Sequence, residues 1–262
     1  MEFTALCSGS AANCLYIRSG KTQILVDAGC SGRYLERSLA SLQVDPAQLT
    51  AILITHEHTD HIKGAALVAR RYNIPIYASE LTWQSLPFYD DFMPWERHQY
   101  QYGSEIGNLG LDFFKLSHDA VQPVGLVFYE QNSQHKDYKL GVVTDSGCLT
   151  ASMLRALEKV DALIIEANYS VEMLQHCRYP LFLKRRIASD HGHLSNYQAA
   201  DLLAQVGGNL QAVLLAHLSQ NSNTPQLALK EVNDRLGQLQ VKLPCMLQIA
   251  LRGEVSPLIS LA

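Results

Sequence analysis

The chain has 262 residues, of which 47% are hydrophobic, and a formal net charge of −4 at pH 7. It contains no linker, low-complexity tract or heptad run, so we expect a single domain over residues 1–262. Because no apolar stretch is long enough to span a bilayer and no leader precedes the first strand, we expect a cytoplasmic protein without membrane contacts. The six cysteines form no Cys-x-x-Cys pair, which argues against a redox motif or a zinc knuckle.

Short strands and helices are predicted along the whole chain. Strands are expected at 2–7, 12–18 and 22–27, then a helix at 34–42, a strand at 51–54, a helix at 62–72 and a strand at 75–78. An aromatic stretch with prolines covers 83–102, followed by strands at 109–116, 124–130, 138–143, 161–165 and 211–215 and helices at 150–158, 195–206 and 225–236. Two strand-led halves with helices outside predict an α/β fold, an αββα sandwich of two mixed β-sheets flanked by helices.

One segment carries a dense set of polar ligands. Residues 56–61 read His-Glu-His-Thr-Asp-His and follow the buried strand predicted at 51–54. The loop after such a strand is where α/β sheets place their sites. Imidazole nitrogens with a carboxylate oxygen favour a borderline divalent metal such as zinc, iron or manganese. His56 and His58 alternate as on an extended chain, and Asp60 and His61 follow after a turn, so the two pairs can face two neighbouring ions.

The pattern His-x-His-x-Asp-His after a hydrophobic strand resembles the signature of the metallo-β-lactamase fold superfamily. The resemblance implies further ligands at strand ends, and three residues in apolar contexts match them in order: His118, Asp145 and His217. It implies two divalent ions per chain, Zn, Mn or Fe. The implied first site is His56, His58 and His118, the second is Asp60, His61 and His217, and Asp145 lies between them.

Asp27 ends the strand predicted at 22–27. In the superfamily this position orients a metal-binding loop from behind the ligands, so the resemblance implies a supporting role for Asp27. A turn-forming aspartate before Gly29 is an equally good interpretation and is compatible with the first.

Glu166 and His193 are candidates for the reaction itself. Their segments resemble loops of the transfer-RNA 3′-processing members, where a Glu and a His pair near the scissile phosphate. The resemblance implies that Glu166 orients His193, which stabilises charge on the phosphate or protonates the leaving oxygen, while a hydroxide between the metals attacks phosphorus. Asp60 is a candidate to orient that nucleophile. The alternative for His193 is a capping histidine beside Ser195.

The resemblance extends nearly end to end. Segments 7–14, 117–120, 144–147, 192–196 and 216–219 together resemble the YycJ/WalJ group of this superfamily. That group implies a metal-dependent hydrolase acting on DNA from 5′ ends, so a nucleic acid is the expected partner, with DNA favoured over RNA. Residues 10–13 read Ser-Ala-Ala-Asn, where the group more often has Ser-Ser-Gly-Asn.

A net charge of −4 gives no general support for a polyanionic substrate, so positive charge must be local. The basic residues between the Glu166 and His193 segments are candidates for phosphate contacts at the rim of the site: Arg178, Lys184, Arg185 and Arg186. A solvated helix face is an equally good interpretation. The aromatic residues of 83–102 allow stacking on unpaired bases, or packing of a flap or dimer contact.

Three functions are therefore compatible with the sequence. A two-metal nuclease, favoured by the motifs, predicts metal-dependent cleavage of long DNA or RNA. A small-molecule phosphodiesterase that opens cyclic phosphates predicts cleavage of small esters and little activity on polymers. A noncatalytic metal-binding interaction protein predicts neither, and the complete ligand set argues against it. The sequence is also compatible with an oligomer.

Overall fold

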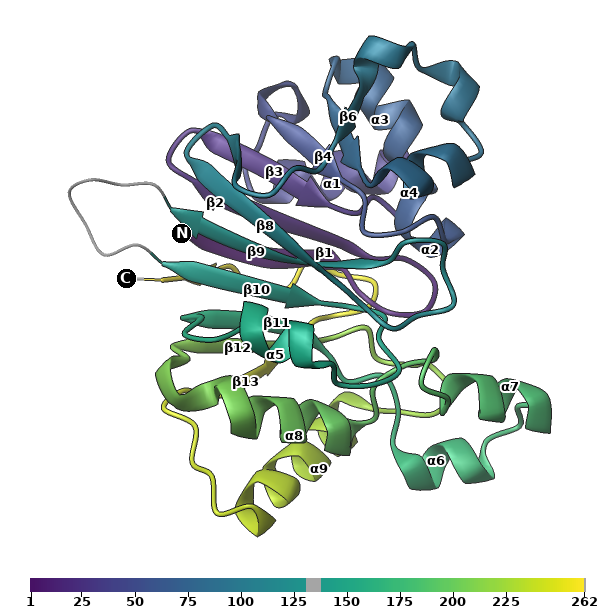
Figure 1. Ribbon diagram of the computed structural model, residues 1–262, viewed down its shortest axis with the longest axis vertical. Helices are drawn as coiled ribbons and strands as arrows, with labels where there is room; N and C mark the ends of the chain where they lie inside the picture. Colours follow the sequence, from purple (N-terminus) through teal and green to yellow (C-terminus); the bar gives the residue numbers. More distant parts are fainter. Residues whose placement is uncertain (131–137, 262) are drawn as a thin grey trace.

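The computed structural model describes residues 1–130 and 138–261, whose strands form two facing sheets (Figure 1). The first sheet has the spatial order β14 (Ile259–Ser260), β1 (Glu2–Cys7), β2 (Cys14–Ser19), β3 (Thr22–Val26), β4 (Ala51–Leu53), β5 (Ile76–Ala78) and β6 (Arg97–Gln99). The second has the order β13 (Leu247–Ile249), β12 (Ala212–Ala216), β11 (Ala162–Glu166), β10 (Lys139–Val143), β9 (Val124–Glu130), β8 (Leu109–Lys115) and β7 (Ser104–Ile106).

Both sheets are mixed. In the first, β1 pairs antiparallel with β2 and β2 with β3, forming a meander, and β3 through β6 are parallel. In the second, β7 through β10 are antiparallel and β10 through β13 are parallel. The carboxyl ends of the parallel strands therefore gather at one edge of each sheet, which is where such sheets bind ligands.

Helices cover the outer faces of the two sheets (Figure 1). The first half contributes α1 (Gly32–Ser41), α2 (Thr59–Ile62), α3 (Ala65–Tyr72) and α4 (Glu80–Ser85). The second half contributes α5 (Ala151–Ala156), α6 (Val171–His176), α7 (Leu181–Ile187), α8 (Asn196–Val206) and α9 (Pro225–Gln238). Short 3-10 turns occur at Pro46–Gln48, Tyr89–Asp91, Pro94–Glu96 and Gly207–Asn209. The predicted αββα sandwich is confirmed.

Apolar side chains fill three layers. The layer between the sheets includes Phe3 and Ile17 from the first sheet and Leu126 and Phe128 from the second. Separate clusters lie between each sheet and its own helices. Burying one such side chain contributes roughly 1.5–3 kcal/mol, so the sandwich fixes the sheets and with them the positions of their edges.

Local sequence signals explain where several helices begin. Ser31, Ser79, Ser170 and Thr224 each accept a hydrogen bond from a backbone N–H in the first turn of the following helix. Ser195 accepts such a bond from Gln198 N at the start of α8, and the Gln198 side chain accepts from Ser195 N in return, which forms a capping box. Such caps typically stabilise a helix by about 1 kcal/mol.

The helix predicted at 62–72 is wrong as a single element. The chain forms α2 and α3 with a break at Lys63 and Gly64. Gly64 N donates to Ala28 O at 2.8 Å, and a Cβ at position 64 would lie 2.2 Å from Cys30 O. The loop after β3 thus passes too close for a continuous helix to carry a side chain there.

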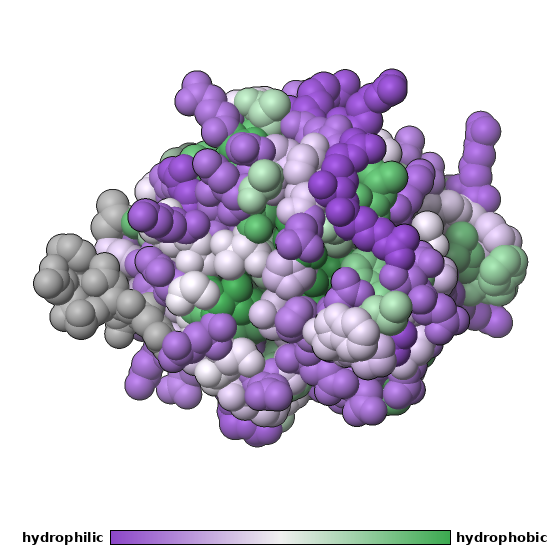
Figure 2. All heavy atoms as spheres, turned by 90° about the horizontal axis from the view of Figure 1, so that it is seen from above, coloured by the Kyte–Doolittle hydropathy of each residue, from purple (hydrophilic) through white to green (hydrophobic). Residues whose placement is uncertain are grey.

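The face seen from the side of α3 and α4 is mostly hydrophilic, with apolar residues in small separate patches (Figure 2). Among the described residues, the structure contains no helix long and apolar enough to cross a membrane.

Candidate metal centre

The expected ligands lie at the carboxyl ends of strands from both sheets. Asp27 follows β3 and His56 lies just beyond β4, and these two strands are parallel neighbours. On the second sheet, Asp145 lies beyond β10, Glu166 ends β11 and His217 follows β12, and these three strands are also parallel neighbours. The parallel registers therefore bring side chains that are far apart in sequence to one edge.

Three site residues adopt the left-handed backbone region. The φ angles are 60° for Asp27, 60° for Asp145 and 53° for His217. A conformation of this kind costs about 1–3 kcal/mol for a residue with a side chain and is retained where the surroundings enforce it. Asp27 N donates to Leu53 O at 2.8 Å, and His217 N donates to Ser8 Oγ at 2.7 Å. The chain turns at once after each strand, which aims these side chains at the shared edge.

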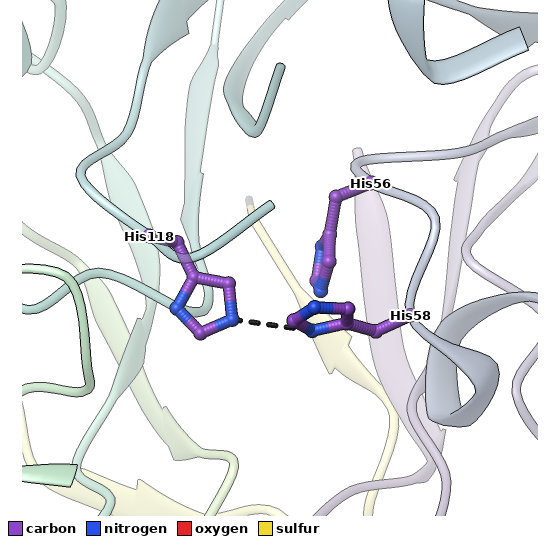
Figure 3. Close-up of side chains that lie close together, drawn as sticks. All are labelled: His56, His58 and His118. Carbon is purple, nitrogen blue, oxygen red and sulfur yellow. Dashed lines mark hydrogen bonds between the residues drawn. The ribbon is translucent and has the colours of Figure 1, made fainter. Parts of the chain in front are cut away.

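The first group consists of His56, His58 and His118, whose rings converge from two loops (Figure 3). One nitrogen from each ring lies within 4.8 Å of the others. His118 Nδ1 donates to Gly192 O at 2.9 Å, which leaves His118 Nε2 facing His58 Nδ1 at 3.3 Å. Burial lowers the pKa of both His56 and His118. Neutral imidazoles with a free lone pair are the form that binds a metal ion.

The second group consists of Asp60, His61 and His217, which also offer ligand atoms within 4.8 Å of one another. His61 Nδ1 lies 2.7 Å from Asp27 Oδ2, so Nε2 is the nitrogen that faces the group. Burial by itself would lower the pKa of His61, but the carboxylates of Asp145 and Asp27 hold it well above its usual value. For Asp60 burial acts in the opposite direction and by itself would raise the pKa. Hydrogen bonds of this carboxylate with His217 and His61 hold the pKa below its usual value.

Asp145 lies between the two groups. Its Oδ2 is 3.1 Å from His61 Nε2, and its Oδ1 is 3.0 Å from His217 Nδ1 and 3.9 Å from His118 Nε2. Burial by itself would raise the pKa of Asp145, but His217 and His61 hold it well below its usual value. The geometry thus presents an ionised carboxylate to both groups.

Several buried atoms at this edge lack a hydrogen-bond partner. Among the described residues they are His56 Nε2, Asp145 Oδ2 and His217 Nε2 in the two groups, and Glu57 Oε2 and Thr144 Oγ1 beside them. Buried polar atoms in folded proteins nearly always have partners. Converging imidazole nitrogens and carboxylate oxygens without partners are the donor set that divalent cations take, so the residues present fit a metal site.

Glu166 links the second group to His193. Its Oε1 lies 2.7 Å from His193 Nδ1 and 2.9 Å from His217 Nδ1, and its Oε2 accepts from Ser146 N and Leu194 N, each at 3.1 Å. Burial by itself would raise the pKa of this fully buried carboxyl, but His193 and His217 lower it to about 2. An ionised Glu166 therefore fixes both rings, and the remaining nitrogen of His193, Nε2, is the one free to meet a ligand.

Members of both groups line one cavity of about 200 Å³, here termed the metal pocket, together with Asp145 and His193: they are His58, His118, Asp60 and His217. Its other wall comes from Ser10, Asn168, Tyr179, Leu183, Arg186, Ile187 and Ser219. The pocket is small and largely polar on its ligand side, which suits a phosphate-sized group and leaves the rest of a larger substrate outside.

Of the four basic residues expected at the rim, Arg186 lines the metal pocket and pairs with Asp119 through its Nε. Lys184 Nζ donates to Gln175 O at 2.6 Å. Arg178 and Arg185 are exposed and, like Lys184, do not line the pocket. The structure thus brings one of the four to the site and leaves three on the surrounding surface.

Sequence reasoning gave no role to Asn13 or Ser8. Asn13 Nδ2 donates to Asp60 Oδ2 at 3.2 Å and lies 3.1 Å from His61 Nε2, while its Oδ1 accepts from Gly9 N at 2.9 Å. Ser8 accepts from the backbone of His217. The available signal was the segment 7–14, which carried part of the resemblance, but a single amide or hydroxyl side chain there does not by itself indicate a site.

Comparison with known proteins identifies the family of this chain. Residues 8–163 match the family described as the metallo-beta-lactamase superfamily. The chain is 36% identical over 240 residues to the exodeoxyribonuclease YycJ of Bacillus anthracis, covering 90% of this chain and 89% of that protein. It is 37% identical over 243 residues to the exodeoxyribonuclease WalJ of Streptococcus pneumoniae, covering 90% and 88%.

A solved structure shares the whole architecture. The metallo-beta-lactamase fold protein YhfI from Bacillus subtilis superposes with a TM-score of 0.72 at 19% identity, covering 97% of this chain and 98% of that one. At this identity the likeness concerns the fold.

Proposed function

The chain belongs to the metallo-beta-lactamase superfamily and is a metal-dependent hydrolase, and from that premise we propose that it is a two-metal exonuclease that degrades DNA from its 5′ end. Two relatives named exodeoxyribonucleases align with nine-tenths of the chain and support a polymeric DNA substrate. The observation that carries the proposal is the contact of Glu166 with His193 at 2.7 Å, beside Asp145, in a pocket of phosphate size.

The proposed ligands divide as the two groups do. His56, His58 and His118 hold the first ion, and Asp60, His61 and His217 hold the second. Asp145 would contribute to both, since Oδ2 lies 3.1 Å from His61 Nε2 and Oδ1 lies 3.0 Å from His217 Nδ1 and 3.9 Å from His118 Nε2. Asp27 holds the His61 ring from behind. Zinc, manganese and iron all suit this donor set.

Two divalent ions bound there supply a hydroxide at neutral pH and bind phosphate oxygens. The protein's own groups do the rest. Asp60 is ionised, about a quarter exposed, and held by Asn13, so its carboxylate accepts a hydrogen bond from the attacking water and orients it. His193 Nε2 passes a proton to the leaving oxygen, while Glu166 keeps the ring in place. Arg186 at the pocket wall offers a guanidinium to a phosphate oxygen.

The test is cleavage of 5′-labelled and 3′-labelled duplex DNA, single-stranded DNA and RNA by protein reconstituted with manganese or zinc. The Asp60→Ala variant is run in parallel, with Asp234→Ala on the exposed side of α9 as the matched control. We expect stepwise loss from 5′ ends by the wild type and the control and not by Asp60→Ala. Release from 3′ ends alone would refute the polarity. Cleavage of small diesters without any polymer cleavage would assign the site to a small-molecule phosphodiesterase.

A further inference from the structure

Two further cavities lie along β8 of the second sheet, beside the metal pocket. The first has a volume of about 290 Å³ and shares His118 with the metal pocket. The second has a volume of about 500 Å³ and shares Ser152 with the first. Each of these cavities shares a wall residue with the next, and the two are here together termed the lateral groove.

The lateral groove follows β8 away from the metal edge. Lys115, the last residue of β8, lines the first cavity, and Asp112, three residues earlier, lines the second. A strand advances about 3.3 Å per residue, so these positions lie about 10 Å apart along the strand. The short helix α5 packs against β8, and its residues Ser152 and Arg155 line the second cavity.

The charge of the groove suits a polyanion. Lys115, Lys139 and Arg155 line it and are all exposed. Within residues 1–130 and 138–261, neither Lys115 nor Arg155 forms an ion pair with a carboxylate. The acid in the lining, Asp112, is engaged through Oδ1 with Gly103 N at 3.0 Å. A net positive path thus starts beside the metal pocket on a chain whose overall charge is negative.

The hydrogen bond between Gly103 N and Asp112 Oδ1 lies next to a stacked pair of aromatic rings, Tyr102 and Phe113. Gly103 follows Tyr102 and has a φ of 68°, and its hydrogen bond to Asp112 fixes the turn. The Tyr102 ring stacks on Phe113 with centroids 4.4 Å apart and an angle of 20°, yet Tyr102 is 73% exposed. One face of the ring is therefore covered by Phe113, while most of the Tyr102 side chain is exposed and lines the second cavity.

Cations beside an open aromatic ring are the combination by which proteins bind single-stranded nucleic acids. A base can stack on Tyr102 only when one of its faces is uncovered, as in an unpaired strand. We propose that the lateral groove binds single-stranded DNA next to the scissile phosphate, with Lys115 and Arg155 on phosphates and Tyr102 on a base. The proposal rests on the nuclease function, and it names the substrate as a single strand or a single-stranded end.

The experiment uses Tyr102→Ala and the double variant Lys115→Glu/Arg155→Glu. Trp95→Ala removes another exposed aromatic ring outside the groove, and Lys21→Glu/Lys242→Glu makes the same charge change elsewhere. Metal-reconstituted proteins are compared on a single-stranded DNA, a blunt duplex and bis(p-nitrophenyl) phosphate. Binding of a fluorescent single strand is measured by anisotropy over a range of salt concentrations.

Tyr102→Ala is expected to weaken single-strand binding and raise KM on the single strand about tenfold, the usual size of a lost base stack. The double charge variant should also weaken single-strand binding and raise KM on the single strand. It should reduce the slope of the logarithm of the binding constant against the logarithm of the salt concentration by about 2. Both groove variants should cleave the small diester at the wild-type rate. Both control variants should match the wild type in single-strand binding and in cleavage of every substrate.

Unchanged single-strand affinity in both groove variants would overturn the inference. A loss confined to the blunt duplex would also overturn it and assign the groove to double-stranded DNA. A wild type that cleaves the small diester and no polymer would refute the nuclease proposal, and the anisotropy measurement would still decide whether the groove binds a single strand.

Discussion

The strand-end ligand cluster and the segment from residue 170 to residue 195 border the same pocket, but they are built differently. Asp145 and His217 are 2% and 1% exposed and lie just beyond strands that have a neighbour on each side in the sheet. The segment 170–195 has two short helices and a small cluster of its own, with Leu181 and Phe182 62% and 74% exposed at its surface.

The two regions are suited to different roles, metal binding and contact with the substrate. A metal site needs ligand atoms fixed to within a fraction of an ångström, which the parallel registers provide. Contacts to a variable polymer are commonly carried by loops and short helices on a rigid scaffold. The segment supplies His193, Arg186 and Tyr179 to the pocket, whereas the proposed metal ligands lie just beyond strands of the two sheets or on the short helix α2. Changes in the two regions should therefore have separable effects on metal content and on turnover.

The largest effect is expected from Asp145→Ala. The change removes the carboxylate between the two groups and leaves the converging histidines to repel one another when protonated. We expect loss of at least one ion and a fall in kcat/KM of more than about 1000-fold. Metal content by mass spectrometry and the cleavage rate are measured together. The control is Asp201→Ala, which breaks a surface pair with Arg235. Full metal content in Asp145→Ala would contradict the bridging role.

His193→Ala should affect turnover alone. Loss of a general acid costs about 10²–10⁴-fold in rate, whereas the proposed metal ligands are untouched. The control is His176→Ala on α6, where the ring is exposed and contacts Glu172 O. A DNA substrate with a sulfur leaving atom, which needs no proton, should restore most of the lost rate. If metal content falls with activity, the residue acts as a ligand or a structural group instead.

Asp27→Ala should weaken metal binding without removing a ligand. Its carboxylate holds His61 Nδ1 and accepts from Thr55 N and Oγ1, both at 2.8 Å. Changes of this kind cost about 10–100-fold in metal affinity. Titration against a chelator measures the affinity, and excess metal should rescue activity. Asp45→Ala, which removes the cap of a 3-10 turn, is the control. An affinity equal to that of the wild type would show that Asp27 only shapes its turn.

The smallest effect is expected in the exposed segment. Arg186→Ala should raise KM for DNA several-fold, while Arg178→Ala and Arg185→Ala should change it by less than about twofold, because their side chains do not line the pocket. Steady-state kinetics at low and moderate salt measure KM for DNA in each of the three variants. Equal effects from all three would favour a diffuse basic surface over a contact at the pocket wall.

The sequence predicted the sandwich because its strands are short apolar runs with clear ends. The strands at 2–7, 109–116 and 124–130 agree with β1, β8 and β9 to within one residue. That residues 1–262 form one domain stays a prediction. The expected ligands came from one dense motif and from single residues at strand ends; the parallel strands β10, β11 and β12 bring Asp145 and His217 to one edge, whereas His118 follows the antiparallel β8.

Other features of the fold and the site could not be predicted from the sequence, for physical reasons. The break between α2 and α3 depends on the distant loop at Cys30, and α6 and α7 are too short to show a helical period. The position of Asn13 against Asp60 and the open ring of Tyr102 depend on how separate segments pack, which no local pattern encodes.

The most direct test of the metal centre is a crystal structure of the manganese-reconstituted protein with anomalous scattering data. We predict two peaks about 3.5–4 Å apart, one among His56, His58 and His118 and one among Asp60, His61 and His217, with Asp145 between them. A single peak, or peaks coordinated by other residues, would contradict the two-metal account.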